Sequence, residues 1–318
     1  MKKFFVFLLF PMIMLCLGAE KELDLSNIKY KIVYESYSNN NWDIYIINAD
    51  GSNKKNITNT PNIHEMYPKV SPNGKKIAFV VDTGEERNRR RDLYLMNIDG
   101  SNRRLIAQHG RQPCWSPDGK YIAFTKSEST RRFSLESWST KGLFFYNMQT
   151  GKITVHPEAT LEHLYNLCWS PDGQYIIATV LGGMGFKHTN IAIEVKGSSY
   201  FELNIAGCRP EFSPRGKYIG WGPSDRQFNI AKIDLSKRPP VADKDKIPFL
   251  YVTEGYEVYH LDWSPDGKYI AFSFGPDGEQ NVGGMARGWN ICVAEVATGR
   301  WKMITFDGNH NKEPDWVP

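Results

Sequence analysis

Histidine recurs at one position of an internal repeat, and imidazole is the side chain best suited to metal binding and proton transfer near neutral pH. The position lies seven residues before a serine that opens the same short motif in each copy. Its six occupants are His64, His109, His163, Ala206, Glu257 and His310. Neutral imidazoles with a carboxylate suit zinc, manganese or a similar divalent ion. The pattern predicts a divalent metal site if these side chains meet. The alternative is loop chemistry copied with the repeat, with rings too far apart to share an ion.

The elements that must position these histidines are themselves repeated. Five copies are obvious: PKVSPNGKKIAF from Pro68, PCWSPDGKYIAF from Pro113, LCWSPDGQYIIA from Leu167, PEFSPRGKYIGW from Pro210 and LDWSPDGKYIAF from Leu261. Each copy reads as a strand, a tight SPDG turn and an alternating second strand, followed by two more short strands. A four-stranded unit that recurs at this spacing predicts the blade of a β-propeller.

The two ends of the chain complete the count. KIVYESY from Lys31, WDIYIINADGSN from Trp42 and KKNIT from Lys54 supply strands two to four of a blade, and EPDWVP at the end supplies a first strand. We therefore predict an all-β fold, a six-bladed β-propeller of four-stranded blades closed by the C-terminal strand, which leaves no free sheet edge. The residues expected in the core between blades are Trp115, Trp169, Phe212, Trp263 and Trp316, with Phe79, Phe124 and Phe272 behind them.

The N-terminal segment has the layout of a secretory signal peptide. Lys2 and Lys3 precede an apolar run from Phe4 to Leu17, and small Gly18 and Ala19 follow. We expect residues 1–19 to be a signal peptide, residues 20–318 to be the propeller, and the mature protein to be periplasmic or secreted. The alternative is a lipoprotein attached through Cys16.

Four cysteines follow the signal segment: Cys114, Cys168, Cys208 and Cys292. Their spacing does not resemble a zinc site, so we expect buried thiols. An oxidising compartment also permits disulfides, and Cys168 with Cys208 is the first pair to test.

The repeat PxWSPDGKYIAF followed by DIYxxNxDGSNxxxIT resembles the propeller repeats of the TolB family, from about residue 30 to residue 318. This resemblance implies a periplasmic propeller that works through protein contacts in envelope maintenance. Once the signal segment is removed, six blades account for the remaining length, so we expect no second domain.

Long insertions between strands two and three share one face of a propeller and carry many basic residues. Loops on a rigid scaffold are where binding residues concentrate. The candidate partner-binding residues are Arg89, Arg90, Arg91, Arg131, Arg132, Lys187, His188, Arg287 and Trp289. These would contact an envelope protein or an anionic polysaccharide; the alternative is solvated charge that maintains solubility.

The net charge of +4, from 39 basic and 35 acidic residues, is too small for a nucleic-acid-binding protein. No GxSxG nucleophile elbow, P-loop or dinucleotide fingerprint is present. We therefore predict an exported, monomeric binding or scaffold protein without a transmembrane span in its mature chain. No cofactor is required, apart from the divalent metal ion that the histidines would bind. The alternative function is a polysaccharide lyase or a metal-dependent carbohydrate-active enzyme that uses the histidines at the channel mouth.

Overall fold

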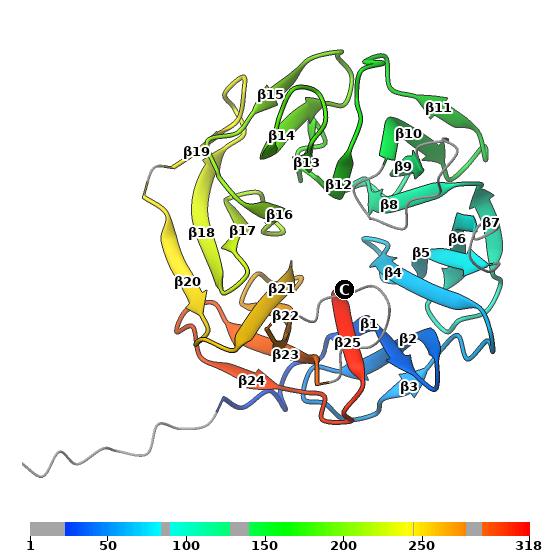
Figure 1. Ribbon diagram of the computed structural model, residues 1–318, viewed down its shortest axis with the longest axis vertical. Helices are drawn as coiled ribbons and strands as arrows, with labels where there is room; N and C mark the ends of the chain where they lie inside the picture. Colours follow the sequence, from blue (N-terminus) through cyan, green and yellow to red (C-terminus); the bar gives the residue numbers. More distant parts are fainter. Residues whose placement is uncertain (1–22, 84–89, 128–139, 244, 278–287) are drawn as a thin grey trace, which may run out of the picture.

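Six blades of antiparallel strands surround a central axis in the computed structural model, which describes residues 23–83, 90–127, 140–243, 245–277 and 288–318 (Figure 1). From the axis outward, blade 1 contains β25 (His310–Val317), β1 (Lys31–Ser38), β2 (Asn41–Asn48) and β3 (Lys55–Asn56). Blade 2 contains β4 (His64–Val70), β5 (Lys76–Thr83), β6 (Arg90–Asn97) and β7 (Arg104–Ala107). Blade 3 contains β8 (Gly110–Trp115), β9 (Tyr121–Ser127), β10 (Thr140–Asn147) and β11 (Ile153–Val155).

The second half of the ring repeats this order. Blade 4 contains β12 (Leu164–Trp169), β13 (Tyr175–Leu181), β14 (His188–Glu194) and β15 (Tyr200–Glu202). Blade 5 contains β16 (Cys208–Phe212), β17 (Tyr218–Ser224), β18 (Gln227–Asp234), β19 (Val241–Ala242) and β20 (Ile247–Tyr251). Blade 6 contains β21 (Tyr256–Trp263), β22 (Tyr269–Pro276), β23 (Asn290–Glu295) and β24 (Trp301–Met303). The predicted six-bladed, all-β fold is confirmed, and the described residues form no helix that could span a membrane.

Blade 5 departs from the four-strand pattern at its outer edge. β18 pairs with two short segments in turn, β20 along Gln227–Ile230 and β19 along Ile233–Asp234. Residues 235–240 carry two prolines, which cannot donate to a strand ladder, so the outer strand is divided.

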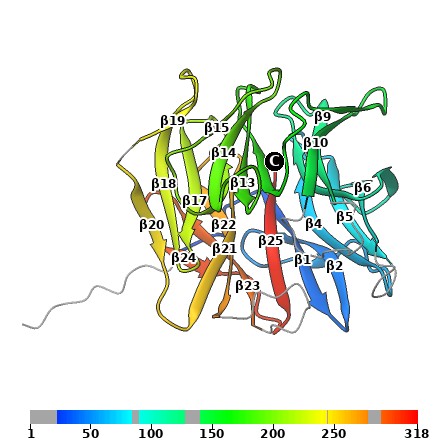
Figure 2. The same cartoon turned by 45° about the horizontal axis from the view of Figure 1, so that its top comes forward.

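The last strand closes the ring, as predicted. β25 lies beside β1 (Figure 2). The two strands pair antiparallel, with Trp316 opposite Ile32 and His310 opposite Tyr37. The inner edge of blade 1 is therefore covered by a strand from the other end of the chain.

The repeat serine explains the tight turn after each inner strand. In blade 3 the Ser116 hydroxyl donates to Asp118 Oδ1 at 2.7 Å and accepts the backbone N–H of Tyr121 at 2.9 Å. The same pair of bonds recurs at Ser170 and Ser264. Gly119 has a φ of 68°, a conformation that favours glycine. The SPDG motif is thus a hydrogen-bonded turn on the face opposite the long loops.

The hydrophobic core is divided among the six interfaces between blades. Trp169, for example, packs with Leu143 and Phe145 of blade 3 and with Ile176 and Val180 of its own blade. All the aromatic residues expected in the core are buried. Cys114, Cys168, Cys208 and Cys292 are free, so the structure does not form the Cys168–Cys208 disulfide.

Candidate functional site in the axial channel

Each inner strand contains a β-bulge at the same point, four residues before the repeat serine or its equivalent. The register with strand two shifts there in all six blades. The residue at this point has a positive φ of 49° to 57° in every blade. These residues, which we call the middle ring, are Tyr67, Gln112, Asn166, Arg209, His260 and Glu313. A positive φ is uncommon for residues other than glycine and costs on the order of 1 kcal/mol or more.

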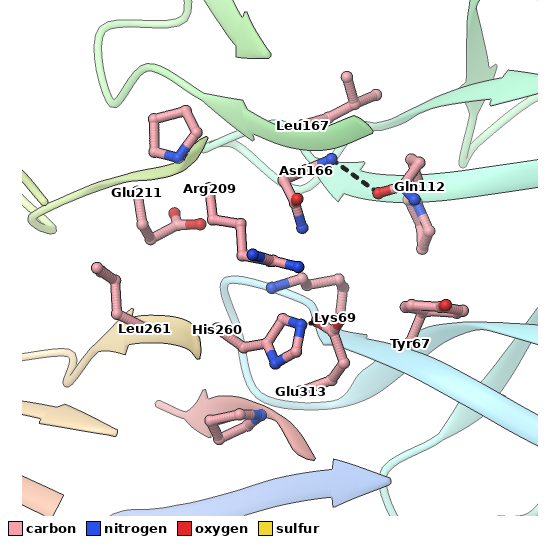
Figure 3. Close-up of a pocket in the computed structure, with 13 residues that line it drawn as sticks. Tyr67, Lys69, Gln112, Asn166, Leu167, Arg209, Glu211, His260, Leu261 and Glu313 are labelled. Carbon is pink, nitrogen blue, oxygen red and sulfur yellow. Dashed lines mark hydrogen bonds and ion pairs between the residues drawn. The ribbon is translucent and has the colours of Figure 1, made fainter. Parts of the chain in front are cut away.

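The middle ring lines a small cavity on the axis of the channel (Figure 3). Its volume is about 30 Å³, enough for one or two water molecules. Lys69 and Glu211 also line this cavity, and side chains from blades on opposite sides of the ring point towards one another in it (Figure 3). The cavity therefore gathers two cations, two acids, an imidazole, a phenol and two amides.

An imidazole–carboxylate pair forms one side of the ring. His260 Nε2 lies 3.0 Å from Glu313 Oε1, and both side chains are more than nine-tenths buried. Burial lowers the pKa of His260 to about 4, although the Glu313 carboxylate opposes this shift. The pKa of Glu313 is lowered to about 2; burial opposes this shift, while the neighbouring His260 and two lysines favour the charged form. At neutral pH the pair is therefore a neutral imidazole beside a carboxylate.

Buried cations surround the ring on the side of the long loops. Arg91 Nε and Nη2 donate to the two oxygens of Asp82, each at 2.6 Å. Lys312 Nζ lies 3.5 Å from Glu35 Oε1, and Glu35 Oε2 accepts the backbone N–H of Tyr67 at 2.6 Å. Burial raises the pKa of Glu35 to about 7, so its negative charge is incomplete at neutral pH.

Two further guanidinium groups lie in the same part of the channel. The Arg209 guanidinium carbon is 4.3 Å from the centre of the Tyr259 ring, an attractive cation–π contact. Arg111 is almost completely buried, and burial with nearby Arg91 lowers its pKa to about 10. The channel on this side is therefore rich in buried positive charge.

The residues predicted to bind a metal lie close to the start of the inner strands. They differ from one another in exposure and in the groups that they contact. His109 is exposed, and His64 Nδ1 accepts the backbone N–H of Trp42 at 3.3 Å. His163 is half-buried and Glu257 is buried. His310 is buried between Trp42 and Trp289, with ring centres 5.2 and 5.9 Å away, and burial lowers its pKa to about 3. Within the described part of the chain, no group of three or more His, Cys, Asp or Glu side chains could hold a metal ion.

The residues predicted to bind a partner divide into three groups. Arg89, Arg131, Arg132 and Arg287 lie outside the described residues. Arg90, Lys187 and His188 are exposed. Arg91 and Trp289 are buried inside the ring; Trp289 packs against Tyr259, as a residue that caps the core would.

The middle ring did not enter the sequence prediction, although the repeats carry a signal for it. Its residues precede the recurring proline or leucine at the same column of the alignment, and all six are polar and different. No particular residue type marks the bulge. The alignment of the repeats therefore does not show that these six side chains face the axis.

Comparisons with known proteins agree with the fold. Dipeptidyl-peptidase 5 of Porphyromonas gingivalis is 28% identical over 323 residues, which covers 85% of this chain and 44% of that protein. The chain thus spans less than half the length of this relative. TolB of Acinetobacter baumannii superimposes with a TM-score of 0.66 at 19% identity, covering 91% of this chain and 67% of that one.

A structure of a nidogen/laminin complex contains a chain with a TM-score of 0.65 at 8% identity, covering 91% of this chain and 98% of that one. At such low identity, these two structural likenesses show the fold alone. A model of the TolB beta propeller domain matches residues 24–227, about two thirds of the sequence. Together with the six-bladed ring, this match shows that the chain belongs to the TolB beta propeller domain family.

Proposed function

We propose that this protein is an exported binding protein that engages an envelope protein or an anionic polymer. The contact surface is the face that carries the long loops, together with the channel that opens there. The predicted signal segment at residues 1–19 supports export. The charged and polar side chains of the channel support binding.

The observation that carries the proposal is the middle ring. Six geometrically equivalent positions hold six different polar side chains, and each holds its backbone at a positive φ. A ring required only for packing would repeat an apolar residue, as the tryptophan column does. Strained and chemically distinct residues gathered at one place are typical of a recognition site.

Charge favours an anionic group on the partner. Arg91, Arg111 and Lys312 are buried and Arg209 is half-buried on the long-loop side of the channel. Two of the acids beside them already have partners, Asp82 with Arg91 and Glu313 with His260, and the raised pKa of Glu35 reduces its charge. An anionic group that enters this side of the channel would therefore find several cationic side chains to contact.

The likeness to a dipeptidyl-peptidase is compatible with this proposal. The similarity covers 44% of that relative, and this sequence contains no GxSxG nucleophile elbow. Without a nucleophile motif, binding is the better supported activity.

Affinity capture from envelope fractions, read by quantitative mass spectrometry, tests the proposal. We expect a partner that the wild-type protein retains, that Arg209→Gln loses, and that Lys268→Gln keeps because Lys268 is exposed on the opposite face. Equal capture by wild type and Arg209→Gln, or no specific partner, would contradict it.

A lyase is the second candidate, because His260 with Glu313 resembles a general base and Lys69 and Arg209 line the same cavity. The cavity of about 30 Å³ holds water and not a sugar ring, which favours binding over catalysis. Incubation with polyuronates should give no absorbance from unsaturated products, with or without added divalent metals. Elemental analysis of the wild type beside His64→Ala/His163→Ala/His310→Ala tests the predicted metal ion.

A further inference from the structure

The face that bears the SPDG turns has its own opening on the axis, which we call the funnel. Its volume is about 410 Å³, within the range of ligand sites in proteins. The mouth consists of the six residues that follow the repeat serines or their equivalent: Pro72, Pro117, Pro171, Pro214, Pro265 and Pro318. The walls consist of Val70, Trp115, Trp169, Phe212, Trp263 and Trp316. The funnel is therefore a deep, largely aromatic recess.

The floor of the funnel holds more acidic than basic residues. Three acids from neighbouring blades, Glu211, Asp262 and Asp315, line it together with a single lysine, Lys69. Lys69 Nζ lies 3.1 Å from Asp315 Oδ1, so the one cation is already paired. Glu211 and Asp262 are half-buried and remain accessible from the funnel.

The hydrogen bonds of these acids leave capacity for another donor. Asp262 Oδ2 accepts the backbone N–H of Trp316 at 2.7 Å, while Asp262 Oδ1 accepts no hydrogen bond from the described residues. Cys168 Sγ donates to Glu211 Oε1 at 2.9 Å. Burial raises the pKa of Glu211 to about 7 and that of Asp262 above its ordinary range. A cation at this position would relieve the repulsion among the carboxylates.

A groove leads outward from the funnel between blades 3 and 4. It has a volume of about 690 Å³ and shares the lining residues Pro117, Trp169 and Pro171 with the funnel, so the two cavities adjoin. Tyr121, Phe145 and Val195 supply apolar surface in the groove, and Asp118, Asp172 and Lys196 supply charged groups beside it. A ligand with a cationic group at one point and apolar groups along an extended chain would complement both cavities.

We propose that the funnel and groove form a docking site for an extended peptide segment, which places a lysine side chain in the funnel and apolar side chains in the groove. The aromatic walls would pack on the aliphatic stem of the lysine and favour its ammonium group by cation–π attraction. The acids on the floor would accept its hydrogen bonds. This site lies on the face opposite the long loops and does not depend on the partner proposed there.

Two peptide libraries test the lysine. The immobilised full chain is exposed to blocked heptapeptides with a central lysine and randomised neighbours, and to the same library with a central glutamine. We expect at least tenfold greater retention of the lysine library, measured by mass spectrometry. Equal retention of the two libraries would overturn the proposal without requiring any change to the protein.

Variants then locate the site, with the best retained peptide as probe and tryptophan fluorescence as readout. Glu211→Gln/Asp262→Asn should weaken binding at least tenfold, whereas Glu254→Gln, an exposed acid outside both cavities, should not. Tyr121→Ser in the groove should weaken binding severalfold, whereas Tyr251→Ser on the outer edge should not. Unchanged affinity in the double variant would overturn the proposal.

Competition by a small cation tests whether the site recognises a peptide or only an ammonium group. Spermidine supplies ammonium groups on an aliphatic stem but no side chains for the groove. We expect it to compete only at concentrations at least tenfold above the peptide. If spermidine binds as tightly as the peptide and Tyr121→Ser has no effect, the funnel is a small-cation pocket and the peptide assignment is wrong.

Discussion

At the scale of single residues, two neighbouring arginines have opposite surroundings. Arg91 is 1% exposed and pairs with Asp82 through two short bonds, whereas 48% of the Arg90 side chain is exposed beside Asp92. The sequence places both in one basic run, and nothing in residue type separates them.

Replacing each arginine by methionine should separate their roles. Arg91→Met leaves the Asp82 carboxylate buried without its partner, so we expect a loss of roughly 3–5 kcal/mol in the free energy of unfolding. Arg90→Met removes an exposed pair and should cost less than about 1 kcal/mol. Urea unfolding of both variants measures the difference; similar losses would show that the Arg91 pair is not essential to the ring.

The His260–Glu313 pair makes a second prediction at this scale. By NMR, the imidazole of His260 should titrate near pH 4 in the wild type. Glu313→Gln should move the titration to still lower pH, because the carboxylate is what favours the imidazolium in this buried place. A titration that rises towards pH 6.5 in the variant would show that the carboxylate does not act in this way.

At the scale of elements, a glycine of β22 makes room for the tryptophan that precedes β23. Gly275 lies under the indole of Trp289, and a Cβ added there would overlap the ring. Trp289 in turn packs against His310 at the start of the closing strand.

Gly275→Ala should therefore displace Trp289 and destabilise the protein by about 1–3 kcal/mol, as overpacked cores do. Gly222→Ala in β17 is the matched control, because an added Cβ there would meet its neighbours at ordinary contact distances of 3.6 Å or more. Thermal unfolding measures both variants. Equal melting temperatures would mean that the indole can move aside at no cost.

Truncation of the closing strand β25 should have the largest effect on stability among the changes considered for single elements. Removing residues 314–318 deletes Trp316 from its interface and Asp315 from Lys69 and the Val70 backbone N–H. We expect loss of the cooperative unfolding transition at the wild-type temperature, while removal of Pro318 alone should leave it. A truncated chain that melts like the wild type would show that the ring tolerates an open blade.

At the scale of the whole molecule, buried acids and histidines set how stability depends on pH. Burial raises the pKa of Glu35, Glu65 and Glu211 to about 7. The folded state therefore binds more protons than the unfolded state between about pH 4.5 and 7, so these residues lower stability as the pH rises. His260 and His310, with pKa values of about 4 and about 3, act in the opposite direction below pH 6.5.

Above pH 6.5 the two histidines lose their remaining protons only in the unfolded state, so they offset a small part of the contribution of the acids. We expect the free energy of unfolding to fall by about 2 kcal/mol between pH 6.5 and 8. Urea unfolding at the two pH values measures this change, and Glu211→Gln should reduce it. A rise in stability over this interval would contradict the assignment of raised pKa values.

Much of this architecture could be predicted from the sequence, because it follows from repetition. The SPDG turns, the alternating strands and the final EPDWVP specify the number of blades and the closure of the ring. The tryptophans occupy one position of the aligned repeats, and this predicted their burial. The channel chemistry could not be predicted in the same way. Residues such as Arg209 and Glu313 face the axis because of a bulge and a positive φ, which depend on pairing between strands and not on local residue type. The funnel and its groove exist only once blades are placed side by side.

The pairing of β25 with β1 also sets an order of events. During synthesis β1 is made early and β25 is made last among the described strands. The residues that pair between them are separated by almost the whole length of the sequence. Such a contact has a high cost in loop entropy and forms slowly. Until residue 317 is available, the inner edge of blade 1 has no partner and the axis is open on one side. The nascent chain can therefore form separate blades but cannot complete its channel, so the two openings of the channel form together when β25 pairs with β1.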